Sequence, residues 1–414
     1  MDRGCDTVPL VTARLMQRLD LLAACSDTPD GLTRLYLSPA HADAAGLVGG
    51  WMRDAGLSVR MDAAATVIGI LAGPRPDSPT LLLGSHLDTV RDAGRYDGAF
   101  GVLGGLAVLE LLQARGTVLP FAVALLAFGD EEGVRFPSTL TGSRALAGTL
   151  DASAQAAVRD ADGMSLGEAL DAFGGHVAGL AGARLPGPAL GFVELHIEQG
   201  PVLERAGLAV GVVSAINGAA RYRLTVTGEA GHAGTVPMTG RRDALAAAAE
   251  MLVAIRRIGL AHDGVTATVG WIEAVPGAVN VIAGQATFTL DLRAPQDAVR
   301  AGAWAEIEAV LAAVARAHAV ELAILRTHEA PAAPCDPGLQ GRLEQACAAV
   351  GADTVRLPSG AGHDAMAMAA LCPMAMLFVR CRGGISHNPE ESIEAADAAI
   401  AVQVLDAFLT GLSV

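Results

Sequence analysis

Alternating hydrophobic and polar stretches in the first half of the chain predict an α/β arrangement of short buried strands and longer helices. The predicted strands cover residues 66–71, 80–84, 121–128 and 191–196, and the predicted helices cover 10–24 and 98–114. Strands 80–84 and 121–128 are followed closely by polar residues. Because open α/β sheets place their active sites at the carboxyl ends of their strands, we expect functional side chains at these two points.

The pattern changes between residues 213 and 328, where strands and helices follow the order βαββαβ. The strands are predicted at 221–227, 264–272, 280–293 and 320–326, and the helices at 242–258 and 296–318. This order is the signature of a ferredoxin-like unit with two layers. The first pattern then resumes with a helix at 339–350, a loop at 357–364, an apolar stretch at 375–379 and a closing helix at 393–412.

The length of 414 residues also favours two domains, because one hydrophobic core usually stops growing at roughly 250–300 residues. We expect residues 1–212 and 329–414 to form an α/β catalytic domain with a mixed central sheet and helices on both faces. Residues 213–328 would be inserted into it as a lid.

Composition and charge exclude some classes of binding partner. The net charge is −15 and every basic residue is an arginine, with no basic run, so nucleic-acid binding is not expected. The apolar stretch 102–112 is interrupted by Glu110 and is too short for a bilayer of about 30 Å, so no membrane partner is expected. The amphipathic start lacks a signal-peptide core, which predicts a cytoplasmic protein. Six cysteines without a Cys-x-x-Cys pair are interpreted as buried thiols.

The candidate chemistry lies in histidines and acids that stand beside glycines or at the ends of predicted strands. Five of them suit metal ligation: His86, Asp97, Glu132, His196 and His387. Imidazole and carboxylate together suit Zn²⁺, Mn²⁺ or Co²⁺, whereas an all-oxygen set would favour Mg²⁺ or Ca²⁺. His387 follows the inserted unit and the other four precede it. A dinuclear metal hydrolase therefore requires that the first and last segments form one domain.

Each motif alone has a plainer interpretation. Asp88 could accept the free imidazole N–H of His86 and orient the ring, although His86 could equally be a core histidine beside a helix cap. Asp97 lies in a turn from which its two oxygens could bridge two cations. Glu131 and Glu132 could serve as a general base and a metal ligand, or as a solvated loop, and adjacency alone does not order them.

Three further positions suit substrate binding. His232 and His363 lie in glycine-flanked loops, where Gly362 would allow a ligand to approach the backbone. His232 belongs to the inserted unit, so it suits polarisation of a substrate carbonyl better than metal ligation. Arg293 ends a predicted strand and could anchor a carboxylate through two hydrogen bonds. The plainer interpretations are a structural pair of His363 with Asp364 and a solvated Arg293.

Taken in order, the motifs resemble the hydantoinase/carbamoylase branch of the dinuclear metal aminoacylase and carboxypeptidase superfamily. The branch includes N-carbamoyl-L-amino acid hydrolases, β-ureidopropionases and allantoate amidohydrolases. The motifs are GSHLDTV, YDGAFGVLGGL, DEEGVRF, ELHIEQGPVLE, GHAGTVPM with RRDA, SGAGHDA and GISHNPEE, spread over residues 60–395. ELHIEQGP separates this branch from ordinary aminoacylases and dipeptidases, which usually carry an acid where this chain has His196.

The resemblance implies an aminopeptidase-like catalytic domain with two divalent ions per subunit, Zn, Mn or Co. His86 and His196 would hold one ion, Glu132 and His387 the other, and Asp97 would bridge them. Glu131 would be the general base and Asp88 would support His86. The positions implied to contact substrate are Gln199, His232, Asn280 and Arg293, the last three from the lid of a neighbouring subunit, so a homodimer is implied.

The expected activity is hydrolysis of a linear ureido or amide C–N bond in a small carboxylate-bearing substrate. Allantoate or an N-carbamoyl-L-amino acid ranks first, N-carbamoyl-β-alanine second, and an acylamino acid or dipeptide last. His232 would stabilise the oxyanion and Arg293 would hold the substrate carboxylate. An inactive metal-binding protein that acts through dimeric interactions is the alternative outside enzymes. The presence of Glu131 argues against it, because a structural metal site needs no free base.

Overall fold

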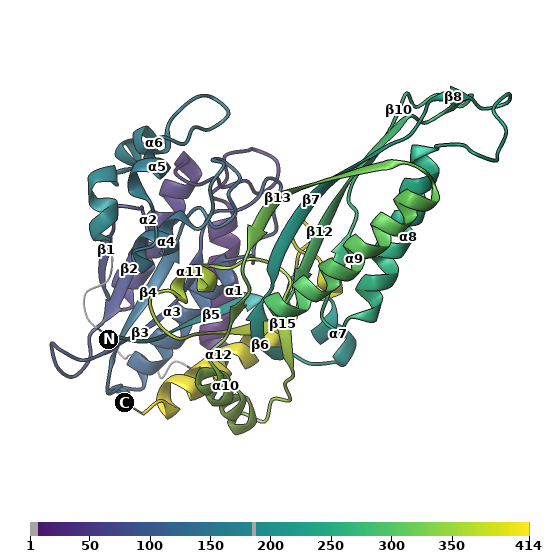
Figure 1. Ribbon diagram of the computed structural model, residues 1–414. Coiled ribbons are helices and arrows are strands. Elements are labelled where there is room, and N and C mark those ends of the chain that lie inside the picture. Colours follow the sequence, from purple (N-terminus) through teal and green to yellow (C-terminus); the bar gives the residue numbers. More distant parts are fainter. Residues whose placement is uncertain (1–6, 184–187, 414) are drawn as a thin grey trace. The chain divides into compact units, whose positions relative to one another are not determined.

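The structure is a computed structural model that describes residues 7–183 and 188–413 (Figure 1). The chain divides into two compact units. Unit 1 comprises the residues up to Ser214, Cys335–Leu357 and the residues from Gly362 onwards. Unit 2 comprises Ala215–Pro334 and Pro358–Ala361. None of the helices in the described ranges is both long and apolar enough to cross a membrane.

Most of unit 1 is built on a mixed sheet in the order β1-β2-β4-β3-β5-β16-β6, with β14 and β15 both paired to β6; the short β14 and the ends of β6 and β15 belong to unit 2. The four central strands β4, β3, β5 and β16 are parallel. On one side β2 joins β4 and β1 joins β2, and on the other side β6 joins β16 and β14 joins β6, all antiparallel. The strands are β1 Ser58–Met61, β2 Val67–Leu71, β3 Thr80–His86, β4 Ala122–Phe128, β5 Ala189–Ile197, β6 Val210–Ile216, β14 Ala333–Pro334, β15 Arg356–Ser359 and β16 Met374–Val379. The expected mixed α/β sheet is confirmed.

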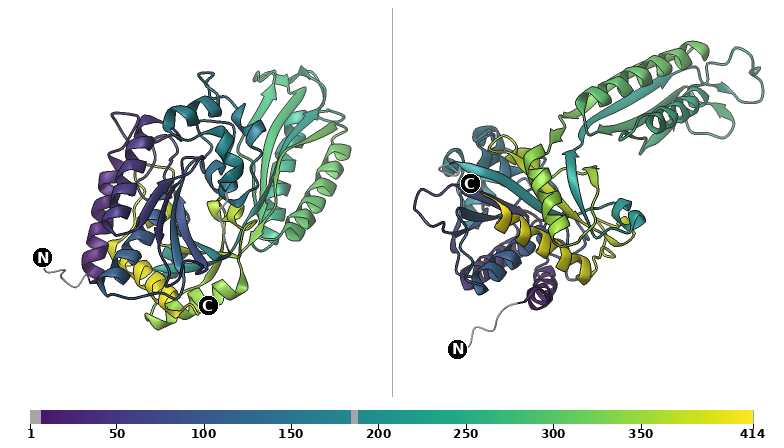
Figure 2. Two further views of the ribbon diagram at one scale, coloured as in Figure 1. Left: turned by 90° about the vertical axis from the view of Figure 1, so that its left-hand side faces the viewer. Right: turned by 90° about the horizontal axis from the view of Figure 1, so that it is seen from below.

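Helices cover both faces of this sheet. On one face α3 packs against β3 and β5, and both α1 and α12 pack against α3 and against each other (Figure 2). On the other face α11 contacts β5, β16 and α4. The helices are α1 Val8–Ala23, α2 Pro39–Asp54, α3 Ala99–Ala114, α4 Thr141–Ala147, α5 Ala152–Ala156, α6 Leu166–Phe173, α7 Val202–Ala206, α10 Pro337–Ala349, α11 Asp364–Met368 and α12 Ala395–Gly411, with short 3₁₀ turns at η1 Val177–Gly182 and η2 Arg382–Gly384.

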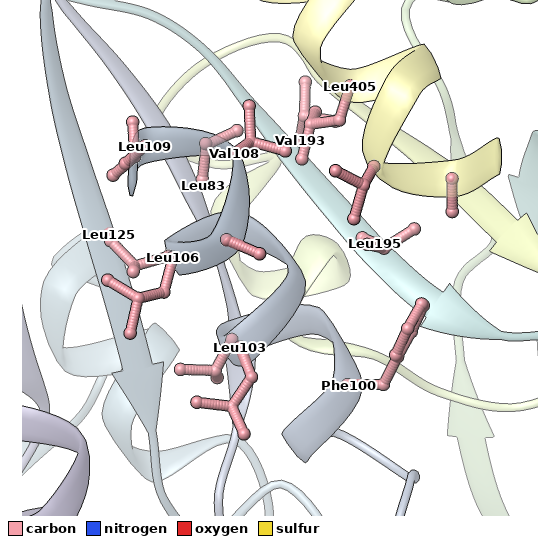
Figure 3. Packing of buried hydrophobic residues seen from close by; sticks show 14 of the residues in the cluster. Leu83, Phe100, Leu103, Leu106, Val108, Leu109, Leu125, Val193, Leu195 and Leu405 are labelled. Atoms are coloured by element: carbon pink, nitrogen blue, oxygen red, sulfur yellow. The ribbon is translucent and has the colours of Figure 1, made fainter. Parts of the chain in front are cut away.

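The close approach of α3 to the sheet depends on its glycines. Leucines of α3 interdigitate with those of β3, β4 and β5 in the main core (Figure 3). A Cβ on Gly101 would lie 2.1 Å from the carbonyl oxygen of Leu195, and one on Gly104 would lie 2.5 Å from the Leu195 side chain. Only glycine fits at position 101, where the close atom belongs to the main chain, and at position 104 the Leu195 side chain would have to move. The contact brings the start of α3 to the carboxyl ends of the central strands.

Unit 2 has two layers, a five-stranded sheet and two helices. The sheet order is β10-β12-β7-β13, with β9 also paired to β12, and all of these pairs are antiparallel. Helices α8 and α9 bury Met251, Ile255 and Ile307 against Leu224 and Phe288 of the sheet. The elements are β7 Gly218–Thr227, β8 Gly231–His232, α8 Ala244–Ala261, β9 Thr266–Thr268, β10 Ile272–Val275, β11 Val281–Ile282, β12 Gln285–Ala294, α9 Asp297–Ala317 and β13 Glu321–Ala330.

Two predicted strands of unit 2 are each divided in the structure. The stretch 264–272 contains β9 and only the first residue of β10, and the stretch 280–293 contains β11 and most of β12. The second division arises because the chain changes partner, since β11 pairs with β8 whereas β12 pairs with β7. Periodicity reports which face of a strand is buried and not which strand lies beside it. The role of unit 2 as a lid stays a prediction.

Candidate metal centre

The five expected ligands lie at the carboxyl ends of the parallel strands. His86 is the last residue of β3, His196 lies near the end of β5, and Glu132 follows β4. Asp97 lies just before α3, and His387 lies in the loop after β16. Since β4, β3, β5 and β16 are neighbours that run in the same direction, these side chains meet at one edge of the sheet.

Asp97 is shared by two groups of ligand atoms. Its Oδ1 lies 3.4 Å from Nε2 of His86 and 3.1 Å from Nε2 of His196. Its Oδ2 lies 3.3 Å from Nε2 of His387, which is also 3.5 Å from Oε2 of Glu132. In each group, Asp97 with His86 and His196 or Asp97 with Glu132 and His387, the candidate ligand atoms lie within 4.8 Å of one another. The carboxylate of Asp97 therefore stands between two potential cation sites.

The two buried imidazoles are oriented by the main chain. Nδ1 of His86 lies 2.9 Å from the carbonyl oxygen of Asp88, and Nδ1 of His196 lies 2.9 Å from the carbonyl oxygen of Ile197. A proton on each Nδ1 satisfies these contacts and leaves each Nε2 unprotonated and directed at Asp97, where Nε2 of His196 also accepts the N–H of Gly98 at 3.3 Å. Gly98 makes room, because a Cβ there would lie 2.4 Å from Nδ1 of His86.

Asp88 supports the site through different atoms from those expected. The carbonyl oxygen of Asp88, and not its carboxylate, is the hydrogen-bond partner of His86, and the carboxylate Oδ1 lies 3.9 Å from Nδ1. The carboxylate accepts hydrogen bonds from the main-chain N–H groups of Glu131 and Glu132, each at 3.2 Å. These bonds connect the loop after β4 to the loop after β3. The sequence could not distinguish a carboxylate from a main-chain oxygen of the same residue.

The electrostatics of the cluster are those of acids and imidazoles crowded together out of water. Burial, with the nearby charge of Asp97, raises the pKa of Glu132 to about 7. Burial raises the pKa of Glu131 well above its usual value, and Glu132 adds to the effect. Burial would also raise the pKa of Asp97, but the imidazoles of His196, His387 and His86 around its carboxylate hold the pKa well below its ordinary range.

This donor set fits divalent cations. Buried carboxylates that repel one another are costly unless a positive charge accompanies them. Three imidazoles and two carboxylates, arranged in two groups around Asp97, supply the nitrogen and oxygen ligands that suit Zn²⁺, Mn²⁺ and Co²⁺. The residues present would therefore accommodate one ion in each group.

Three expected substrate-binding residues border the centre. Gln199 donates from Nε2 to Oδ2 of Asp97 at 2.7 Å. The ring of His363 is buried, and its centroid lies 4.5 Å from that of His196 in an edge-on arrangement. A Cβ added to Gly362 would lie 3.9 Å from Oε1 of Glu131, so the backbone there is close to the expected base.

The other expected substrate residues belong to unit 2. His232 in β8 pairs with Val281, and the N–H of Ala233 donates to the carbonyl oxygen of Asn280 at 2.9 Å. The side chains of His232 and Asn280 are exposed. Arg293 donates from Nε and Nη2 to the carboxylate of Asp291 at 2.7 and 3.0 Å. A carboxylate of the protein itself thus already occupies one edge of the guanidinium expected to anchor substrate.

Sequence reasoning missed several polar residues that hold the ligands. Glu194 accepts hydrogen bonds from the Ser85 hydroxyl at 2.7 Å and from the N–H of Ala365 at 2.9 Å. Ser386 and Glu391 contact Asp97 and its main chain. Glu194 could have been found, because an acid inside an apolar strand requires a partner. Ser386 and Glu391 lie in the GISHNPEE motif, but their partner is almost 300 residues away in the sequence.

The chain is similar along most of its length to known amidohydrolases. Residues 82–411 match the peptidase family M20/M25/M40. The chain is 41% identical over 394 residues to an N-carbamoyl-L-amino acid amidohydrolase of Geobacillus stearothermophilus, covering 95% of this chain and 96% of the relative. It is 40% identical over 409 residues to an allantoate deiminase of Arabidopsis thaliana, covering 91% and 78% respectively.

Solved structures show the same similarity in three dimensions. A hydantoinase/carbamoylase family amidase from Burkholderia multivorans superposes with a TM-score of 0.91 at 34% identity, over 96% of this chain and 97% of that one. The aminopeptidase PepT of Bacillus cereus superposes with a TM-score of 0.65 at 16% identity, over 96% and 98%. The latter similarity concerns the fold alone, and it confirms the aminopeptidase-like architecture expected for the catalytic domain.

Proposed function

Because this chain belongs to the peptidase family M20/M25/M40, in its hydantoinase/carbamoylase group, we propose that it is a metal-dependent amidohydrolase of small ureido acids. The reaction is hydrolysis of a linear ureido or amide C–N bond beside a carboxylate-bearing carbon. The observation that carries the proposal is the pair of ligand groups that share Asp97.

The proposed centre holds two ions, one between His86, His196 and Asp97 and one between Asp97, Glu132 and His387. Such ions lower the pKa of water and polarise the substrate carbonyl. The geometry supports this division because each oxygen of Asp97 faces a different group of imidazoles. Zn²⁺, Mn²⁺ and Co²⁺ all suit these ligands.

Glu131 is the proposed general base. Its Oε2 lies 4.0 Å from Nε2 of His86, and its main chain is fixed by Asp88. Burial raises its pKa well above that of an ordinary glutamate, which suits a group that accepts a proton and then releases it. Glu131 takes a proton from the attacking water and delivers it to the leaving nitrogen.

Substrate selection is assigned to residues around this base and to unit 2. Gln199, Gly362 and His363 lie at the centre itself. We propose that His232 stabilises the oxyanion and that Asn280 and Arg293 bind the substrate, with unit 2 acting as the lid of a partner subunit in a homodimer. The assignment of unit 2 as a lid in a homodimer rests on the family resemblance, which GHAGTVPM and RRDA carry in this unit.

The favoured substrates are N-carbamoyl-L-amino acids and allantoate. Relatives named for each of these activities match more than nine tenths of the chain at similar identity. N-carbamoyl-β-alanine ranks behind them, and acylamino acids or dipeptides come last. With an N-carbamoyl substrate, water and the ureido group yield the amino acid, carbon dioxide and ammonia.

The test begins with protein from which metal has been removed by chelation. Zn²⁺, Mn²⁺ or Co²⁺ is then restored separately. Release of ammonia is measured for allantoate, N-carbamoyl-L-amino acids and N-carbamoyl-β-alanine, and release of the free amino acid is measured for N-acetyl amino acids. Activity restored by a metal on a ureido acid supports the proposal, and failure of every combination rejects it.

Replacement of the proposed base gives the second test. Glu131→Gln preserves shape but cannot accept the proton, so kcat should fall by about 10²–10⁴ while metal content stays that of the wild type. Steady-state kinetics and elemental analysis of the same preparation measure the two quantities. Full activity of Glu131→Gln would show that another group is the base.

A further inference from the structure

Glu391 lies buried beside the loop that carries Asp97. Its Oε1 accepts hydrogen bonds from the main-chain N–H groups of Tyr96 at 2.8 Å and Asp97 at 3.1 Å. The side chain is only 3% exposed. It packs so closely that a Cβ on Gly94 would lie 2.3 Å from it. Glu391 therefore fixes the backbone from which the shared carboxylate projects.

The other carboxylate oxygen of Glu391 reaches the second ligand loop. Oγ of Ser386 lies 3.1 Å from Oε2 of Glu391 and 2.9 Å from Oδ2 of Asp97. Ser386 directly precedes His387, whose side chain is half exposed and whose backbone has a positive φ of 54°. One glutamate thus connects the loop of Asp97 to the loop of His387, although the two are almost 300 residues apart in sequence.

We propose that Glu391 is a positioning residue that holds Asp97 and His387 in the relative placement needed for the second ion, between Asp97, Glu132 and His387. The inference rests on the proposed dinuclear centre. His86 lies in a strand and His196 in another, where ladder hydrogen bonds hold the backbone. His387 lies in a loop and depends on the link through Ser386. Loss of Glu391 should therefore weaken the second site more than the first.

The number of protons available for hydrogen bonds at Ser386 decides which substitutions of Glu391 are informative. The Ser386 hydroxyl has one proton but faces two carboxylates, those of Asp97 and Glu391. In Glu391→Gln, the amide nitrogen can donate to the Ser386 oxygen, which leaves the hydroxyl proton for Asp97. The amide oxygen can still accept from the main chain of Tyr96 and Asp97. Glu391→Gln therefore preserves every contact, whereas Glu391→Ala removes them all.

The experiment measures binding of Zn²⁺ to the metal-free full chain by titration calorimetry, with elemental analysis after dialysis. Wild type should bind two ions per chain. Glu391→Ala should bind the first ion nearly as wild type and the second about 10–100-fold more weakly, the usual cost of losing a residue that orients ligands. Glu391→Gln should recover most of the wild-type affinity. Glu390→Ala, an exposed neighbour in the same loop, is the matched control and should behave as wild type.

The outcomes separate this inference from the proposed function. A wild-type chain that binds no Zn²⁺ rejects the dinuclear centre itself. If the wild-type chain binds two ions and Glu391→Ala binds both with the same affinities, the positioning role of Glu391 is rejected and the dinuclear centre is not. If Glu391→Ala does not fold, as judged by thermal unfolding of the metal-free protein, Ser386→Ala decides. It removes the hydroxyl that links the loops, together with its contact from Gln199 at 3.4 Å, and leaves the bonds of Glu391 to the main chain of Tyr96 and Asp97 in place, so an unchanged second affinity overturns the proposal.

Discussion

At the residue scale, Asp62 shows how burial makes a single carboxylate oppose folding. Its Oδ1 accepts the N–H groups of Ala64 and Thr66, each at 2.9 Å, yet burial raises its pKa from 3.8 to about 6. The unfolded chain loses the proton near pH 4 and the folded chain keeps it until about pH 6. Stability is therefore lost as pH rises through this window and stays lower above it.

Asp62→Asn should remove this penalty, because an amide oxygen still accepts both N–H groups. The gain in unfolding free energy should approach an upper limit of about 3 kcal/mol above pH 6, at roughly 1.4 kcal/mol per pKa unit, and should vanish near pH 4. Urea unfolding at pH 4 and pH 7 measures the difference. Asp54→Asn, at an exposed position, should show no such dependence. A gain equal at both pH values would mean that ionisation is not its cause.

Individual residues also show which parts of the candidate site could be predicted from the sequence. The approach of His86 to Glu132 was predictable because His86 ends one short apolar strand and Glu132 follows another, and strand ends converge by topology. Glu391 was not, because its role depends on the main chain of Tyr96, and no local pattern reports so distant a partner. The sequence predicted that the carboxylate of Asp88 would support His86, but the contact with Nδ1 of His86 is made by the carbonyl oxygen of Asp88.

At the element scale, α3 connects core packing to the metal centre. Its glycines let the helix approach β5, and Gly101 faces the carbonyl oxygen of Leu195 at a distance that excludes a methyl group. Gly101→Ala should destabilise the protein by about 1–3 kcal/mol through overpacking. It should also weaken metal binding, because Asp97 lies just before the start of α3. Denaturant unfolding and Zn²⁺ titration measure both effects.

Gly46 in α2 provides the matched control for this substitution. A Cβ there meets no atom within 4 Å, so Gly46→Ala should raise stability by about 0.5–1 kcal/mol through helix propensity and leave metal binding unchanged. Equal effects of the two substitutions would show that the α3 contact is not tight. The sequence predicted α3 from its apolar run, but its distance from the sheet emerges only when Leu195 is placed beside it.

At the scale of the whole molecule, the proposed metal centre lies entirely in unit 1. Its residues come from the segments that precede and follow unit 2 in the sequence. His86, Asp97, Glu132 and His196 precede the insertion, and His387 follows it. The sequence predicted this discontinuity because a shared site requires the first and last segments to meet. The order of strands within the sheet, in which β16 lies between β5 and β6, could not be predicted, because the pairing partner of an apolar run is not encoded locally.

This arrangement predicts which segments lose stability when the metal is removed. A cation that binds only the folded chain stabilises it by about 4 kcal/mol at a thousandfold excess over its dissociation constant. Chelation should therefore lower the unfolding temperature. Amide hydrogen exchange should increase in the loops of Asp97, Glu132 and His387, which lose their common charge partner. The β7 and β12 ladder of unit 2 carries no proposed ligand, so its exchange should be unchanged. Equal loss of protection in both units would mean that the metal supports the whole chain and not the junction of its first and last segments.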